Sequence, residues 1–285
     1  MATRPSSLII TAIPVLMGTA LALADGIAHI PTALIALFGG LMIHIGTNLT
    51  NDYYDLLRGA DKIGDFDPMR GNLVGAVPLK AIGWGSVIAF LLLIPPGLYL
   101  IARAGWPIVV IAILSVTAGI FYTAGHHPLA YLGGFGDLFV LVFFGPVALA
   151  GTYYVQSLEL NTAVCLAGLG PGLFAVCVLT INNIRDEQSD RQQDKQTLVV
   201  RFGRQFGYTE FLSALFTAAL IPVLIFSLIC DHAGILFASL IVFPAIPLIK
   251  KILTTNDSAG YNQGIGMTIQ LLLIYGIVFS LGWIT

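Results

Sequence analysis

The sequence predicts an all-α polytopic membrane protein. Of its 285 residues, 57% are hydrophobic and only 10% are charged, and the mean hydropathy is +0.89. An ordinary soluble domain carries about 25% charged residues. The net charge of −2 provides no basic excess of the kind that nucleic-acid binding requires, so we expect no nucleic-acid partner.

Nine apolar segments approach or reach the roughly 20 residues that a helix needs to cross the hydrocarbon core. Together they predict one domain over residues 1–285, with nine transmembrane helices at 6–24, 31–57, 79–102, 106–124, 132–156, 161–184, 209–230, 232–250 and 262–284. The first segment also resembles a secretory signal peptide, but the apolar run there is typically about 7 to 15 residues. Here the run extends from Leu8 to Ala24, which favours a retained helix.

The distribution of lysine and arginine predicts the orientation of these helices. With the N-terminus in the cytoplasm, one side of the membrane holds Arg103 alone. The cytoplasmic side holds the others: Arg4, Arg58, Lys62, Arg70, Lys80, Arg185, Arg191, Lys195, Arg201, Arg204, Lys250 and Lys251. Because basic residues concentrate in cytoplasmic loops, this bias supports nine spans with the C-terminus outside.

Most of the acidic residues gather in two short segments, each directly after an even-numbered span. Of the fifteen Asp and Glu residues, five lie between 52 and 67 and four lie between 186 and 194. The predicted topology brings both segments to the cytoplasmic face, although they are far apart in the sequence. We therefore expect them to meet.

The spacing within each segment places polar side chains on one helical face. Residues four apart share a face, which pairs Asn51 with Asp55 and aligns Asn182, Asp186 and Asp190 as one stripe. Like charges at this spacing repel each other, and a divalent cation would relieve the repulsion. Hard oxygen ligands without histidine or cysteine favour Mg²⁺, which completes its shell with water and phosphate oxygens. A solvated loop whose charges only end the helix is the alternative, although topology needs only the basic residues.

Two sequence stretches carry a family resemblance. "NDYYDLLRGAD" and "NNIRDEQSDRQQDKQTLVVRFG" resemble the paired aspartate-rich motifs of the UbiA superfamily of intramembrane prenyltransferases, which have nine helices around a central cavity. Within that superfamily, "TNLTNDYYD", "FFGPVALAGTYYVQ" and the second motif are most similar to 1,4-dihydroxy-2-naphthoate polyprenyltransferases of menaquinone biosynthesis. The resemblance extends from the first predicted helix through the ninth.

The resemblance implies a set of site residues. The implied Mg²⁺ ligands and catalytic residues are Asn51, Asp55, Asp61, Asp186 and Asp190. The implied contacts to the prenyl diphosphate are Arg58, Lys62, Asn182, Arg185 and Lys195. Asp61 follows Asp55 by six residues, where the superfamily motif often has four, so its contact to the metal is either direct or through water.

The implied activity is transfer of a polyprenyl group from its diphosphate to 1,4-dihydroxy-2-naphthoate, with loss of CO₂ and diphosphate, in the bacterial inner membrane. Another aromatic acceptor, such as 4-hydroxybenzoate, homogentisate or chlorophyllide, is an alternative. From other classes we consider a membrane transporter with acidic sites at the cytoplasmic face and a CDP-alcohol phosphotransferase. A transporter places its polar residues near the bilayer midplane, and a phosphotransferase holds its aspartates in one compact motif.

Overall fold

The computed structural model describes residues 7–57, 77–125, 128–229 and 231–285. Within these residues the chain is helical, with one isolated bridge between Leu132 and Gln196. The α-helices are α1 Leu8–Ala24, α2 Ile30–Leu57, α3 Leu79–Leu91, α4 Ile94–Ala104, α5 Trp106–Phe121, α6 Phe135–Val142, α7 Ala148–Ser157, α8 Thr162–Arg185, α9 Glu187–Gln192, α10 Leu198–Phe202, α11 Arg204–Ile229, α12 Val242–Thr254 and α13 Ser258–Ile284. Two 3₁₀ helices and a π-helix complete the set: η1 Leu129–Tyr131, η3 Ala233–Ile241 and η2 Phe143–Val147.

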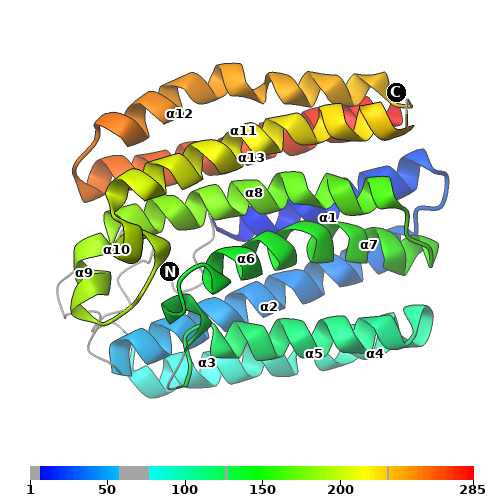
Figure 1. Ribbon diagram of the computed structural model, residues 1–285. Coiled ribbons are helices and arrows are strands. Elements are labelled where there is room, and N and C mark those ends of the chain that lie inside the picture. Colours follow the sequence, from blue (N-terminus) through cyan, green and yellow to red (C-terminus); the bar gives the residue numbers. More distant parts are fainter. Residues whose placement is uncertain (1–6, 58–76, 126–127, 230) are drawn as a thin grey trace.

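The long helices run alongside one another in a bundle (Figure 1). Helix α8 lies at its centre and packs against α11, α13, α6, η2 and α7. Its apolar residues are buried on nearly all sides, whereas the peripheral helices expose large apolar side chains. Such an outer surface suits hydrocarbon, where a helix also satisfies its own backbone hydrogen bonds.

Helices occupy all nine of the predicted segments, but they differ in length. Seven helical stretches of the described residues are long and apolar enough to cross a membrane. Two further apolar helices, α1 and α5, contain 17 and 16 residues. At 1.5 Å per residue they span roughly 25 Å, less than the core thickness of about 30 Å. Seven spans are thus supported by the structure, and the count of nine and the orientation stay predictions.

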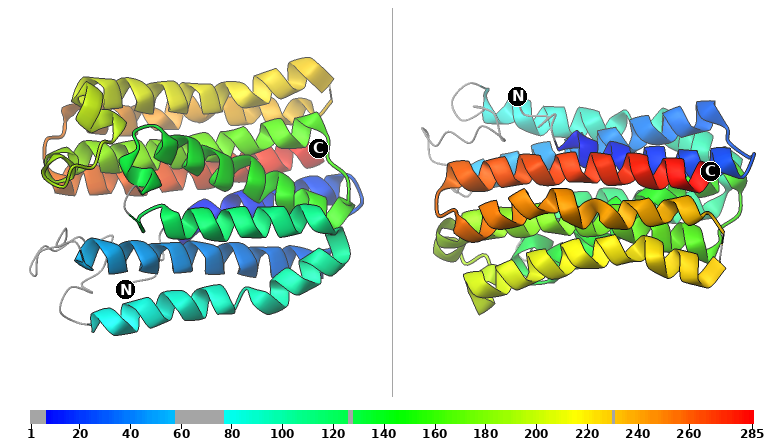
Figure 2. Two further views of the ribbon diagram at one scale, coloured as in Figure 1. Left: turned by 60° about the horizontal axis from the view of Figure 1, so that its bottom comes forward. Right: turned by 90° about the horizontal axis from the view of Figure 1, so that it is seen from above.

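Three of the predicted spans are interrupted helices. The third bends at Leu92 and Leu93, ahead of Pro95 and Pro96, and divides into α3 and α4 (Figure 2). The eighth begins as the 3₁₀ helix η3 before it continues as α12. Proline removes a backbone donor and clashes with the preceding turn, which accounts for the first break.

The fifth predicted span contains the π-helix η2 between α6 and α7. Gly145 there adopts φ −112° and ψ −108°, and Pro146 follows it. The bulge approaches α8 so closely that a Cβ atom added to Gly168 would lie 2.6 Å from Pro146 Cα. Glycine at this position therefore allows the two backbones to meet.

The second acidic motif does not lie on one straight helix, which corrects the stripe expected from the sequence. Helix α8 ends at Arg185, and Asp186 joins it to the short helix α9 with φ −95° and ψ 7°. The amide of Asp186 still donates to Asn182 O at 2.9 Å, and that of Asp190 donates to Asp186 O at 2.9 Å. The four-residue spacing therefore persists while the chain turns.

We expect Gly168→Ala to destabilise the protein by about 1 to 3 kcal/mol, because the added methyl group overpacks the contact with the π-helix. The free energy of unfolding in detergent, followed by circular dichroism, measures the effect. Gly266→Ala is the matched control, because a Cβ atom there meets nothing within 4 Å. Equal stability of the two variants would contradict the prediction.

Candidate functional site

The two acidic segments lie at the same end of the bundle. Helix α2 ends there with the first motif, and the junction of α8 and α9 carries the second (Figure 1). Tyr122, directly after α5, lies within the electrostatic field of both. The carboxylates of Asp137, Asp190 and Asp55 all lie within electrostatic range of its hydroxyl. Tyr122 is therefore close enough to sense both Asp55 and Asp190, which are more than a hundred positions apart in the sequence.

The first motif extends along the last two turns of α2. Asn51 accepts a hydrogen bond from the Thr123 hydroxyl through its side-chain oxygen. Asp55 lies one turn further on and is half-buried, while Asp52 is 5% exposed. The helix continues to Leu57, so Asn51 and Asp55 share a face as the spacing predicted.

In the second motif, Arg185 holds Asp186 in place. Its guanidinium donates two hydrogen bonds to the Asp186 carboxylate, from Nε at 2.8 Å and from Nη2 at 2.7 Å. A third bond runs from Nη1 to the side-chain oxygen of Asn262 in α13. A bidentate pair of this kind fixes the carboxylate in orientation as well as position. Arg185 thereby ties the end of α8 to the start of α13.

A lysine accompanies the buried aspartate of the second motif. The Asp190 residue is 5% exposed, and Lys195 Nζ lies 3.1 Å from its Oδ1. The backbone folds back to allow this contact, because the Lys195 amide donates to Asp190 O at 2.9 Å. The Lys195 ammonium also lies within electrostatic range of Asp137 at the start of α6. One cation thus faces two acidic residues.

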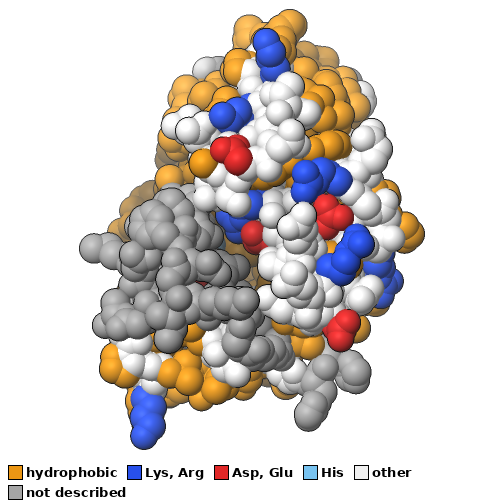
Figure 3. Space-filling model, turned by 90° about the vertical axis from the view of Figure 1, so that its left-hand side faces the viewer, with side chains coloured by type: hydrophobic (Ala, Val, Ile, Leu, Met, Phe, Trp, Pro, Cys, Tyr) orange, Lys and Arg blue, Asp and Glu red, His pale blue; other side chains and the backbone are white. Residues whose placement is uncertain are grey.

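The end of the bundle that carries both motifs shows acidic and basic side chains side by side (Figure 3). At its rim, Glu187 pairs with Arg191 at 3.3 Å and with Arg204 at 3.4 Å. Arg103 lies at the opposite end, where it donates to Val155 O at 2.7 Å and to Gln156 O at 3.1 Å. This separation agrees with the sidedness of the sequence, without identifying which end is cytoplasmic.

The described members of the nominated set lie at one end of the bundle, and their roles in the site stay predictions. Asn182 lies one turn before Asp186 on α8 and accepts its backbone N–H. Arg58, Asp61 and Lys62 lie outside the described residues. Within the described ranges, no group of three or more His, Cys, Asp or Glu side chains is placed to hold a metal ion. Since Mg²⁺ commonly takes only one or two carboxylates, the metal site stays a prediction.

Two contacts at this end were not predicted from the sequence, those of Thr123 and Asn262. Thr123 and Asn262 contact the nominated Asn51 and Arg185, respectively. Asp137 Oδ1 is buried without a hydrogen-bond partner among the described residues, which suits a neighbouring cation. Thr123, Asp137 and Asn262 are each polar residues at the motif-bearing end of an apolar helix, and this much is visible in the sequence. The sequence does not indicate which neighbouring residue each of them contacts.

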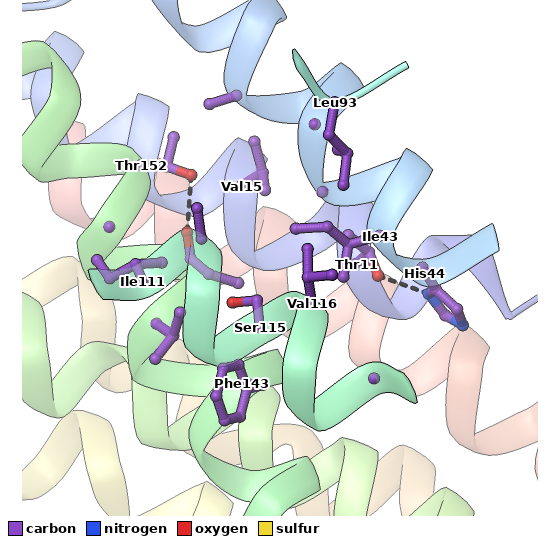
Figure 4. Close-up of a pocket in the computed structure, with 18 of the residues that line it drawn as sticks. Thr11, Val15, Ile43, His44, Leu93, Ile111, Ser115, Val116, Phe143 and Thr152 are labelled. Carbon is purple, nitrogen blue, oxygen red and sulfur yellow. Dashed lines mark hydrogen bonds between the residues drawn. The ribbon is translucent and has the colours of Figure 1, made fainter. Parts of the chain in front are cut away.

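An apolar cavity of about 230 Å³ lies between α1, α2, α4, α5, η2 and α7 (Figure 4). The polar side chains in its wall are Thr11, His44, Thr47, Ser115 and Thr152. Aromatic rings extend from the acidic end toward the cavity. Tyr122 lies 6.1 Å from Phe139, and Phe139 stacks on Phe143 at 4.1 Å between ring centroids. These rings therefore lead from Tyr122, near the charged end, to the wall of a mostly apolar cavity.

The comparisons with known proteins agree with this arrangement. The family model of the UbiA prenyltransferase family matches residues 11–263. A 1,4-dihydroxy-2-naphthoate octaprenyltransferase from Escherichia coli (strain K12) is 33% identical over 98% of this chain and 92% of its own. The protein of that name from Mycobacterium tuberculosis is 38% identical over 70% and 68%. A solved UbiA homolog from Archaeoglobus fulgidus, bound to GPP and Mg²⁺, shares the fold with a TM-score of 0.67 at 14% identity, covering 98% of each chain.

We expect Asn262→Leu to destabilise the protein by about 1 to 3 kcal/mol, because Arg185, whose side chain is 7% exposed, loses a hydrogen-bond acceptor. Asn262→Asp keeps an acceptor at this position and should retain stability. Thermal unfolding in detergent compares the two variants. Wild-type stability of the leucine variant would show that the link from α8 to α13 contributes little.

Proposed function

Because the chain belongs to the UbiA prenyltransferase family, we propose that it transfers a polyprenyl group from polyprenyl diphosphate to 1,4-dihydroxy-2-naphthoate, releasing diphosphate and CO₂ and giving demethylmenaquinol. The observation that supports the proposal is that the two acidic motifs lie at the same end of a helical bundle that also holds an apolar cavity. The names of the relatives at 29 to 38% identity support the naphthoate acceptor. None of those names favours 4-hydroxybenzoate, homogentisate or chlorophyllide, or a transport function.

The metal in this proposal is Mg²⁺, held by Asn51, Asp55, Asp61, Asp186 and Asp190. The described donors fit such an ion, because they are carboxylate and amide oxygens and Asp190 is buried. The Archaeoglobus fulgidus homolog, which is bound to GPP and Mg²⁺, supports the choice of metal. When bound, Mg²⁺ would supply positive charge for a leaving diphosphate.

The basic residues of the site would bind the diphosphate. Lys195 is the best placed of those described, since its ammonium lies beside Asp190 and near Asp137. Asn182, Arg58 and Lys62 complete the proposed contacts. Arg185 already makes three side-chain bonds, so we assign it chiefly to positioning Asp186. Such preorganised charge is often the largest contribution to a rate enhancement.

The reaction itself needs a dry space. The bond between C1 of the prenyl group and the diphosphate oxygen breaks, and its electron pair leaves with the diphosphate. A ring carbon of the acceptor forms the new bond to C1, and the electrons of the bond to CO₂ then restore the aromatic ring. The rings of Phe139 and Phe143 can stabilise positive charge on the allylic carbon through their faces. The apolar helices around them exclude water, which would otherwise capture the cation.

The proposed reaction occurs at a membrane surface. The exposed apolar side chains of the bundle place the protein in a lipid bilayer, and the bilayer can accommodate the long prenyl tail. We propose the bacterial inner membrane, with the acidic end facing the cytoplasm. The excess of basic residues at that end supports this orientation.

Purified protein with Mg²⁺, octaprenyl diphosphate and 1,4-dihydroxy-2-naphthoate should form the decarboxylated prenyl product, detected by mass spectrometry. Acceptor labelled with ¹³C in its carboxyl group should release labelled CO₂ in equal amount, and EDTA should abolish both signals. 4-Hydroxybenzoate and homogentisate, tested in parallel, should give little product. Preferential prenylation of either alternative acceptor would contradict the proposal.

Asp55→Ala should lower turnover by a factor on the order of 100 or more, because a proposed metal ligand is lost. Initial rates at saturating substrates and varied Mg²⁺ measure the effect, and size-exclusion chromatography verifies folding. Glu159→Gln, at an exposed position at the opposite end of the bundle, is the control and should leave the rate unchanged. Undiminished turnover of a folded Asp55→Ala protein would remove the metal-site assignment.

A further inference from the structure

His44 is the one residue with a readily ionisable side chain among the described residues that line the apolar cavity. It belongs to α2, the helix that carries Asn51 and Asp55, and it is 7% exposed. Seven residues separate it from Asn51, which corresponds to about 10 Å along the helix axis. His44 therefore lies about two helical turns from the proposed diphosphate site, toward the middle of the bundle. In Figure 4 it stands at one end of the labelled cavity side chains.

The imidazole ring is held from two sides. Its Nδ1 lies 2.6 Å from the Thr11 hydroxyl of α1, and its edge meets the Phe144 ring of η2 with centroids 5.1 Å apart. Its Nε2 lies 3.4 Å from the Ser7 hydroxyl, which is longer than the usual range of about 2.7 to 3.2 Å. When the neutral ring accepts a bond at Nδ1, the proton resides on Nε2. The short contact with Thr11 thus sets the orientation of the ring, with Nε2 on the side of Ser7.

The chemistry of the proposed acceptor matches this position. Its reacting carbon must approach the prenyl C1 near the diphosphate, and that carbon bears the carboxylate. The 4-hydroxyl is the ring hydroxyl farther from the reacting carbon, so it points deeper into the cavity. The other cavity-lining polar groups are neutral hydroxyls, and that of Thr152 already donates to Ala148 O at 2.7 Å.

We propose that His44 hydrogen-bonds the 4-hydroxyl of the naphthoate acceptor, and that Thr11 is the positioning residue that orients the imidazole. The inference rests on the proposed function, since it concerns the acceptor of that reaction. It assigns recognition of the ring to α2, the helix that also carries the first acidic motif. One helix would thereby position both the acceptor ring and the diphosphate that leaves.

A purely structural role for His44 would also account for its contact with Thr11, so the test must measure recognition of one hydroxyl. The probes are 1,4-dihydroxy-2-naphthoate and 1-hydroxy-2-naphthoate, which lacks the 4-hydroxyl. Equilibrium binding of each to the purified full-length protein is followed by naphthoate fluorescence. The readout is the ratio of the two dissociation constants, because a general loss of folded protein changes both alike.

Wild-type protein should bind the dihydroxy compound at least about tenfold more tightly, since a site built to bond a hydroxyl rejects the analogue that lacks it. His44→Phe keeps a ring against Phe144 but removes both nitrogens, and it should reduce the ratio to within twofold. Thr11→Val should reduce the ratio in part, whereas Thr11→Ser should retain it. His29→Asn is the control, because His29 lies at the other end of α2, next to Thr32.

A ratio in His44→Phe equal to that of wild type would overturn the inference, as would a wild-type protein that binds both compounds equally. If His44→Phe does not fold, an unchanged ratio in Thr11→Val overturns it instead. Wild-type protein that binds neither naphthoate would overturn the proposed acceptor, and this inference with it. If wild-type protein forms the product and the variants keep the wild-type ratio of dissociation constants, the role of His44 is overturned while the proposed function stands.

Discussion

Repulsion between carboxylates is the main constraint on the motif-bearing end of the bundle. Asp55, Asp137 and Asp190 all lie within electrostatic range of Tyr122, next to a membrane interior that cannot solvate charge. Arg185 and Lys195 offset part of that repulsion, each through a short contact to an aspartate. The proposed Mg²⁺ and the basic residues proposed to bind the diphosphate would offset the remaining negative charge. The proposed diphosphate site would therefore lie at the end of the bundle, where water and basic side chains can offset its charge.

The position of this end depends on α8, the most deeply buried of the long helices. It approaches the π-helix through Gly168 and ends at Arg185, where the second acidic motif begins. Helix α2 supplies the corresponding support on the other side, with its polar residues extending from His44 to Asp55. In the proposed reaction, these two helices would hold the metal, the diphosphate and the acceptor, and their rigidity would keep the reacting groups aligned.

Several features of the site could be predicted because they depend on local spacing and on partition between water and hydrocarbon. Asn51 and Asp55 share a face since α2 is regular there, and the bias of basic residues placed both motifs at one end. The turn at Asp186, the kink before Pro95 and the π-helix at Gly145 were not predicted in detail. The kink has a local cause in Pro95 and Pro96, whereas the π-helix depends on close packing of Gly145 and Pro146 against α8. The contacts of Thr123 with Asn51 and of Asn262 with Arg185 depend on packing in the same way.

Composition and the lengths of the apolar runs were enough to predict a helical membrane protein, because hydrocarbon excludes charge and forces the backbone into helices wherever it crosses. The family came from a different source, the resemblance of the two aspartate-rich motifs to known ones. Only the tertiary structure decided that Lys195 pairs with Asp190, that Arg185 is engaged by Asp186 and Asn262, and that His44 lines the cavity. The physical reason is that a side chain's partner is set by the rotation and depth of each helix in the bundle. Those are properties of packing between helices distant in the sequence.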